Sequence, residues 1–145
     1  MKKAKMKDFD TIWSEFKKNR DVFPHIRTDY LKRQIKNNNV IYHDGVILIF
    51  GEYKRRGTLG DFQYNKGDLI IHQILNSRKG NGIARIIMNR FIVANDSQCR
   101  SIILSVRSSN TRARRFYEKM GMSVVGNISW SKGTIGGKIY GYEIE

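Results

Sequence analysis

The chain has 145 residues, of which 40% are hydrophobic, and its 27 lysine and arginine residues outnumber 13 acidic ones, giving a formal net charge of +14. This length predicts one domain, and seven phenylalanine, seven tyrosine and two tryptophan residues indicate a globular core and exclude disorder. The only cysteine, Cys99, excludes an internal disulfide, and three histidines without metal-ligand spacing predict no metal site.

The basic charge predicts attraction to an anionic partner: nucleic acid, a membrane surface or a phosphorylated small molecule. No segment approaches the roughly 20 apolar residues that a membrane-spanning helix needs. The basic start, MKKAKMKDFD, is not followed by the apolar region of a signal peptide. We therefore expect a cytoplasmic protein without a membrane partner.

The first half of the chain predicts helices followed by a hairpin. Residues 2–7 are a candidate polar strand. Apolar residues then recur at the spacing of one helix face, at Phe9, Ile12, Trp13 and Phe16. Leu31 and Ile35 mark a second helix. The segment VIYHDGVILIFGEYK predicts a hairpin around Asp44 and Gly45, and RRGTLGDFQYNKGD predicts a loop.

The second half alternates buried strands with helices. LIIHQIL and SIILSV are nearly continuous apolar runs, as expected of strands covered on both faces. Helical stripes follow them, at Ile83, Ile86, Ile87 and Phe91 and at Ala113, Phe116, Tyr117 and Met120. Gly121 would end the second helix. MSVVGNISW and KIYGYEIE predict two final strands, of which GYEIE is a candidate exposed edge and dimer contact.

The predicted order, β-α-α-β-β-β-α-β-α-β-β, indicates an α/β fold over residues 1–145. Its strand-helix-strand-helix centre implies a parallel strand pair joined by a crossover helix. The remaining strands predict a mixed sheet with helices on both faces.

A glycine loop, RKGNGIAR at residues 78–85, joins a buried strand to a helix. Glycines let the backbone approach a ligand closely, and the first amides of a helix attract anions, so the loop suits a phosphate or pyrophosphate. The Walker motif is absent, and the third glycine of the dinucleotide fingerprint is missing. A turn without a ligand is the alternative.

A second motif runs from Val106 to Met122, VRSSNTRARRFYEKMGM, with the pattern N-x-x-A-x-x-F-Y-x-x-x-G-hydrophobic. Together the two motifs resemble the GNAT superfamily of N-acetyltransferases over the whole chain. The family's cofactor motif, [QR]-x-x-G-x-[GA], aligns with Lys79, Gly80, Asn81, Gly82, Ile83 and Ala84. Lys79 replaces the usual glutamine or arginine and loses the planar fork of arginine.

The resemblance implies a mostly antiparallel sheet whose central parallel strands splay apart around acetyl-CoA. It implies that the loop of residues 79–84 holds the pyrophosphate. The backbone of Ile74, Leu75 and Asn76 would pair with the pantetheine arm. Further cofactor contacts are implied at Asn110, Ala113, Phe116 and Tyr117, although Asn110 is also a candidate helix N-cap.

The resemblance implies that the Tyr117 hydroxyl protonates the leaving thiolate, although Tyr117 also lies on the apolar stripe and could belong to the core. For the general base, the spacing to Ile74 favours Asp68 slightly over His72. Glu52 and an ordered water are further alternatives.

The expected activity is acetyl transfer from acetyl-CoA to a primary amine by direct attack in a ternary complex. The segments expected to select the acceptor are basic, so we expect a small-molecule or peptide amine that is not strongly cationic. Two alternatives stay open: a CoA-binding sensor without catalysis, and a basic nucleic-acid-binding protein. A homodimer is a further possibility of this fold.

Overall fold

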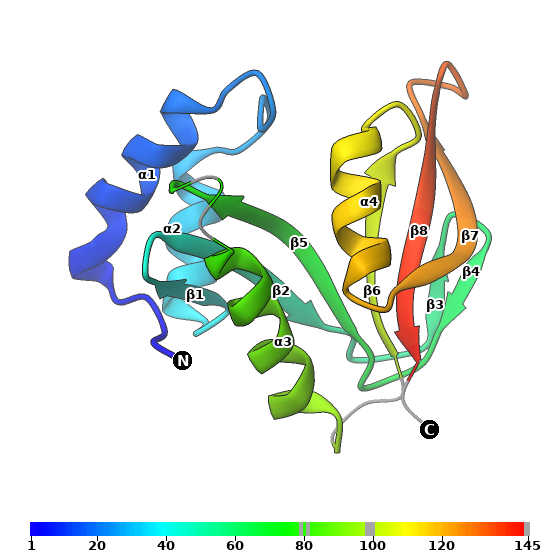
Figure 1. Ribbon diagram of the computed structural model, residues 1–145, viewed down its shortest axis with the longest axis horizontal. Helices are drawn as coiled ribbons and strands as arrows, with labels where there is room; N and C mark the ends of the chain where they lie inside the picture. The colour runs from blue at the N-terminus through cyan, green and yellow to red at the C-terminus, as the bar shows by residue number, and fades with distance from the viewer. Residues whose placement is uncertain (79, 81, 98–100, 144–145) are drawn as a thin grey trace. The chain divides into compact units, whose positions relative to one another are not determined.

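The computed structural model describes residues 1–78, 80, 82–97 and 101–143. Lys79, Asn81 and Cys99 lie outside the described residues. The first helices are followed by a run of strands, and the second half of the chain alternates strands with helices before two final strands (Figure 1). The bounds are η1 (Met6–Asp8), α1 (Phe9–Lys18), α2 (Thr28–Lys36), β1 (Val40–His43), β2 (Val46–Glu52), β3 (Gly57–Leu59), β4 (Phe62–Tyr64), β5 (Leu69–Asn76), α3 (Ile83–Asn95), β6 (Ser101–Arg107), α4 (Thr111–Lys119), β7 (Ser123–Trp130) and β8 (Ile135–Glu143).

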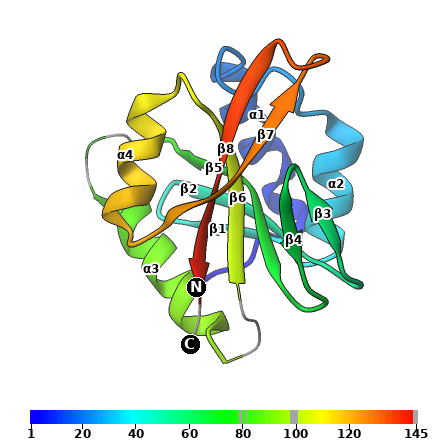
Figure 2. The ribbon, with the colours of Figure 1, turned by 90° about the vertical axis from the view of Figure 1, so that its right-hand side faces the viewer.

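One sheet has the strand order β1-β2-β5-β6-β8-β7. Strand β5 runs parallel to β6, whereas β1–β2, β6–β8 and β7–β8 are antiparallel pairs. The predicted mixed sheet with one central parallel pair is therefore confirmed. The prediction of an edge strand at GYEIE is wrong for its described part, because Gly141 pairs with Ile103 of β6 and with Ser123 of β7 (Figure 2).

Two compact units divide the chain, and both β5 and α3 contribute to each. Unit 1 comprises residues 1–50 and 73–87, and unit 2 comprises residues 51–72 and 88–145. Each unit is built around apolar side chains of its own. No helix in the described part of the chain combines the length and the apolar character needed to cross a membrane.

In unit 1, helices α1 and α2 pack on the β1–β2 hairpin (Figure 1). The predicted helix stripes are the ones that face inward: Ile12, Phe16, Leu31 and Ile35 are each at most 3% exposed. They join Val40, Ile47 and Ile49 from the strands in one apolar cluster. Burial of such side chains, each worth about 1.5–3 kcal/mol, fixes both helices on the sheet.

The N-terminal segment forms less regular structure than predicted. Instead of a strand over residues 2–7, Lys3 makes an isolated antiparallel bridge with Ile41 of β1, and η1 follows. The amide of Ala4 donates to the carbonyl of Val40 at 2.9 Å, and Ala4 itself is buried. Asp8 accepts from the Lys5 amide at 2.8 Å, which turns the chain into the helix.

In unit 2, the segment predicted as a loop forms a second, two-stranded sheet, β3–β4. This hairpin packs its apolar side chains against the larger sheet at Ile70, Ile103 and Ile139. Its turn also binds β7, because Asp61 Oδ1 accepts from the Asn127 amide at 2.6 Å and the Asp61 amide donates to the Asn127 carbonyl at 3.1 Å. The hairpin is thus fixed on the sheet.

Candidate functional site

The glycine loop precedes α3 and lies in unit 1. Gly80 has φ +87° and Gly82 has φ +74°, a left-handed conformation that side chains other than hydrogen rarely adopt. A Cβ atom at either position would meet nothing within 4 Å. The glycines are therefore required by backbone conformation, and the space beside them is open to a ligand. These features fit an anionic group in front of the first turn of α3.

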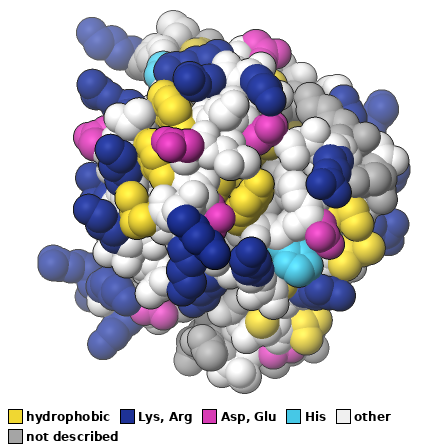
Figure 3. All heavy atoms as spheres, turned by 90° about the vertical axis from the view of Figure 1, so that its left-hand side faces the viewer, with side chains coloured by type: hydrophobic (Ala, Val, Ile, Leu, Met, Phe, Trp, Pro, Cys, Tyr) yellow, Lys and Arg dark blue, Asp and Glu magenta, His cyan; other side chains and the backbone are white. Residues whose placement is uncertain are grey.

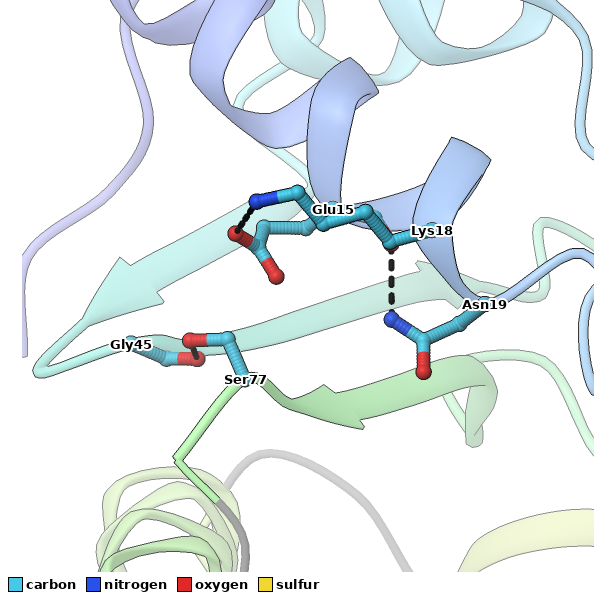
Figure 4. A network of polar contacts seen from close by, with 5 residues as sticks. All are labelled: Glu15, Lys18, Asn19, Gly45 and Ser77. Atoms are coloured by element: carbon cyan, nitrogen blue, oxygen red, sulfur yellow. Dashed lines mark hydrogen bonds and ion pairs between the residues drawn. The ribbon is translucent and has the colours of Figure 1, made fainter.

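Ser77, the residue after β5, anchors this loop to the β1–β2 turn through two hydrogen bonds. The Ser77 hydroxyl donates to the carbonyl of Gly45 at 2.7 Å, and the Ser77 amide donates to the same carbonyl at 2.9 Å. Figure 4 shows this contact, and also the pair formed by Glu15 and Lys18 near the end of α1. A Cβ at Gly45 would lie 2.7 Å from Ser77 Oγ. The start of the glycine loop is therefore held by the hairpin that Asp44 and Gly45 close.

The parallel ladder between β5 and β6 has two partner pairs, Leu69 with Ile102 and Ile70 with Ile103. Strand β5 continues to Asn76, through the residues expected to contact a pantetheine arm. Of these, Leu75 is 3% exposed and belongs to the apolar cluster of unit 1, whereas Ile74 is half-buried. A short parallel ladder is what a pair of splayed strands requires.

The second motif lies on α4 in unit 2. Asn110 Oδ1 accepts from the Ala113 amide at 3.2 Å, which confirms the predicted N-cap. Gly121, with φ +88°, follows the helix end as predicted. Phe116 and Tyr117 are half-buried and touch edge to face, with ring centroids 5.6 Å apart.

Tyr117 is a protonated group at all ordinary pH values. Burial raises the pKa of Tyr117 to about 12. Among the described residues, none forms a hydrogen bond with its hydroxyl, so the proton is not committed to a protein acceptor there. The ring lies 5.9 Å from that of Tyr140 on β8. Tyr117 therefore has the state that a proton donor needs.

A polar network between α4 and β8 was not predicted from the sequence. Tyr140 is completely buried, and its hydroxyl accepts from Arg114 Nε at 3.1 Å and donates to Glu118 Oε2 at 2.7 Å. Arg114 also donates to the carbonyl of Ser108 at 3.0 Å. The helix spacing of Arg114 and Glu118, four residues apart on one face, was the available signal.

Asp68 lies buried between the turn before β5 and the start of β6. It is 1% exposed, and its two carboxylate oxygens accept from the amides of Asn65, at 2.7 Å, and Ser101, at 3.2 Å. These bonds join the turn before β5 to the start of β6. A buried carboxylate used in this way favours a structural role over proton transfer to an acceptor.

His72 is an exposed residue of β5 whose ring lies over Gly51 of β2. A Cβ at Gly51 would lie 3.0 Å from His72 Nε2, so the absence of a side chain there makes room for the imidazole. Partial desolvation lowers the pKa of His72, which keeps the ring neutral at pH 7. The third candidate, Glu52, is engaged by Lys54 Nζ at 2.8 Å. Within the described residues, His72 is thus the candidate whose neutral ring keeps a basic nitrogen without a hydrogen-bond partner.

The surface charge is largely unpaired. In the described part of the chain, Lys18 and Lys54 are the lysine or arginine residues that lie within 4.0 Å of a carboxylate oxygen. The face in Figure 3 carries many lysine and arginine side chains with acidic ones between some of them. Among the residues that the structure describes, no group of three or more histidine, cysteine, aspartate or glutamate side chains could hold a metal ion.

The resemblance seen in the sequence predicted three features that the structure contains. They are the glycine loop, the short parallel ladder and the capped helix α4 that carries Tyr117. Residues 9–122 match the model of the acetyltransferase (GNAT) family. The chain therefore belongs to the GNAT family of acetyltransferases. A comparison with curated proteins found none that matches it.

Solved structures share this fold. NAA60 of Arabidopsis thaliana, crystallised in one case with a bisubstrate analogue and in another with acetyl-CoA, is 16% identical, with 99% of this chain and 98% of that chain covered and a TM-score of 0.71. The protein smu.2055 of Streptococcus mutans UA159 is 19% identical over 100% of both chains, with a TM-score of 0.74. The ribosomal-protein-S18-alanine N-acetyltransferase of Escherichia coli is 14% identical, covering 99% and 92%, with a TM-score of 0.70. At these identities the likeness shows the fold alone.

Proposed function

We propose that this protein is an N-acetyltransferase that moves an acetyl group from acetyl-CoA to a primary amine. The observation that carries the proposal is the loop before α3, where Gly80 and Gly82 adopt left-handed conformations with open space beside them. The left-handed conformation accounts for glycine at both positions, and the open space beside them leaves room for a ligand in close contact with the backbone. Membership of the acetyltransferase family supports acetyl-CoA as that ligand.

In this proposal the residues of the loop, Lys79 to Ala84, bind the pyrophosphate through backbone amides and the positive end of α3. The backbone of Ile74, Leu75 and Asn76 at the end of β5 pairs with the pantetheine arm. Asn110, Ala113, Phe116 and Tyr117 contact the remainder of the arm from α4. Lys79 and Asn81 lie outside the described residues, and their contribution rests on the motif alone.

Proton transfer in the reaction requires one acceptor and one donor. When bound, acetyl-CoA supplies a thioester whose carbonyl carbon is attacked by the amine nitrogen, and the carbon–sulfur bond breaks. His72 accepts the proton that the amine loses, directly or through water, because its lowered pKa keeps it neutral at pH 7. The Tyr117 hydroxyl donates a proton to the sulfur that leaves. We assign the base to His72 instead of Asp68, since Asp68 is buried and bonded through both oxygens.

The acceptor in this proposal is a small-molecule or peptide amine without strong positive charge. Arg55, Arg56 and Lys66, around the β3–β4 hairpin, are exposed, and none forms an ion pair within the described chain. A polyamine would meet like charges here, whereas an amine that also carries a carboxylate or phosphate would be attracted.

The test begins with calorimetric titration of acetyl-CoA into the wild type and into Gly82→Asp. We expect micromolar binding by the wild type and its loss in the variant, where a carboxylate would stand beside the pyrophosphate. A panel of anionic, neutral and polycationic amines is then assayed for CoA release with the wild type and Tyr117→Phe. Spermidine as the best acceptor would contradict the inferred acceptor class.

Other results would redirect the assignment. Binding without turnover on any amine would indicate a CoA-binding module without catalysis. No binding at all would mean that the glycine loop is only a turn. The net charge of +14 would then direct attention to nucleic acid.

A further inference from the structure

One face of α4 meets a single buried side chain of β8. Tyr117 and Glu118 come three and four residues after Arg114, so each lies one helical turn from Arg114. All three contact Tyr140, two through hydrogen bonds and Tyr117 through its ring. Tyr140 is 0% exposed and lies in the middle of the sheet of unit 2, paired with Leu104 of β6.

The hydroxyl of Tyr140 forms hydrogen bonds with two side chains of α4, one as acceptor and one as donor. It accepts from Arg114 Nε at 3.1 Å and donates to Glu118 Oε2 at 2.7 Å, so a neutral phenol separates a cation from an anion. A second guanidinium nitrogen of Arg114 donates to the Ser108 carbonyl at 3.0 Å, just before the helix. The rotation of α4 about its axis is therefore fixed at three points.

We propose that Tyr140 is a positioning residue for Tyr117. The Tyr140 hydroxyl binds Arg114 and Glu118, the two charged side chains near Tyr117 on α4, and so holds Tyr117 in place. This inference rests on the proposed function, in which the Tyr117 hydroxyl protonates the leaving sulfur. Tyr140 does not touch the reacting atoms in this scheme. It acts by keeping Tyr117 in place and its proton available.

The physical reason lies in what Arg114 and Glu118 would do without this partner. Glu118 is exposed and next to Tyr117 in the chain, and Arg114 is one turn before it. A carboxylate released from Tyr140 is a strong acceptor for a neighbouring phenol, and a hydrogen bond from Tyr117 would commit the proton that catalysis needs. Releasing the guanidinium would also loosen the start of α4. The bonds to Tyr140 prevent both changes.

The experiment is a double-mutant cycle on kcat with Tyr140→Phe and Tyr117→Phe, alone and combined, in the full chain. The matched control is Tyr142→Phe, on the same strand and face, whose hydroxyl forms no hydrogen bond in the described structure. We expect Tyr140→Phe to lower kcat about tenfold with the KM for acetyl-CoA nearly unchanged, and Tyr142→Phe to change neither.

The combined variant decides between positioning and general stability. If Tyr140 acts through Tyr117, adding Tyr140→Phe to Tyr117→Phe produces no further loss of kcat. A further loss of the same size would overturn the proposal, because Tyr140 would then support the fold without acting on Tyr117. Full activity of Tyr117→Phe alone would instead refute the acid role itself, and the inference with it.

A second variant covers the case in which Tyr140→Phe does not fold. Glu118 is exposed, so Glu118→Ala should fold while it removes the acceptor of the Tyr140 hydroxyl. We expect a smaller loss of kcat, because Glu118→Ala removes the competing carboxylate together with the hydrogen bond and leaves only a looser placement of Tyr117. This loss should also disappear in the Tyr117→Phe background. Unchanged kcat in Glu118→Ala would contradict the proposal.

Discussion

Gly80 and Gly133 form a matched pair that separates backbone strain from ligand contact. Both have φ +87°, and a Cβ at either would meet nothing within 4 Å. Alanine in this conformation costs about 1–2 kcal/mol at each position. For a chain of this size that corresponds to a fall in Tm of about 2–8 °C, equal for Gly80→Ala and Gly133→Ala. Gly133 follows β7 in the turn before β8, and Gly80 precedes α3.

Affinity for acetyl-CoA should distinguish the two variants. A methyl group at Gly80 would occupy space assigned to the pyrophosphate and displace at least one charge-assisted hydrogen bond, worth about 1.5–3 kcal/mol. The dissociation constant should rise about 10–100-fold in Gly80→Ala and stay unchanged in Gly133→Ala. Calorimetry gives the affinity and thermal unfolding gives the stability. If both variants lose the same stability and bind acetyl-CoA like the wild type, the loop does not contact the cofactor.

Three further outcomes follow from the geometry of unit 2. Asp68→Asn should lower the free energy of unfolding by about 1–3 kcal/mol in urea titrations, because the Asp68 carboxylate accepts hydrogen bonds from two backbone amides. The kcat of this variant should stay within a few fold of the wild type. A large loss of kcat in a stable variant would restore Asp68 as the base. For His72, the lowered pKa means that falling pH protonates the base only below the ordinary pKa of a histidine, so kcat/KM should decline there. His72→Gln should abolish this limb of the profile. An unchanged profile in His72→Gln would exclude His72. Gly60→Ala should destabilise more than Gly133→Ala does in the same thermal assay, because a Cβ at Gly60 would collide with the carbonyl oxygen of Asn127 as well as straining the backbone; equal losses would contradict that contact.

Helices and buried strands were predictable because their signals are local. The stripe of Ile12 and Phe16 is buried as its spacing predicted. The stripe in α3 holds for Ile87 and Phe91, but Ile86 is 47% exposed. The β3–β4 hairpin was missed because its glycines and charges are typical of a loop. The hairpin is held by a distant partner, since Asp61 in its turn binds the backbone of Asn127, and no local pattern reveals that contact.

In the candidate site, too, local features were predictable from the sequence and long-range contacts were not. The helix end at Gly121 and the Asn110 cap depend on neighbouring residues, and the sequence predicted both. The burial of Asp68 depends on Ser101, 33 residues away, and the Tyr140 network joins residues 22 and 26 positions apart. Such contacts depend on strand order and register, which spacing along the chain does not contain. The chemical roles of Tyr117 and His72 stay predictions.

The contact of Lys3 and Ala4 with β1 has a consequence for how the chain acquires its structure during synthesis. The amide of Ala4 binds the carbonyl of Val40, and Ala4 leaves the ribosome before Val40 does. The bond can therefore form only after Val40 has emerged. Until then the basic start has no strand to join. Once formed, the bridge between Lys3 and Ile41 covers part of a strand edge that could otherwise recruit a second nascent chain. Removing the first four residues should therefore leave α1 and α2 able to form while making the newly made protein prone to associate through β1.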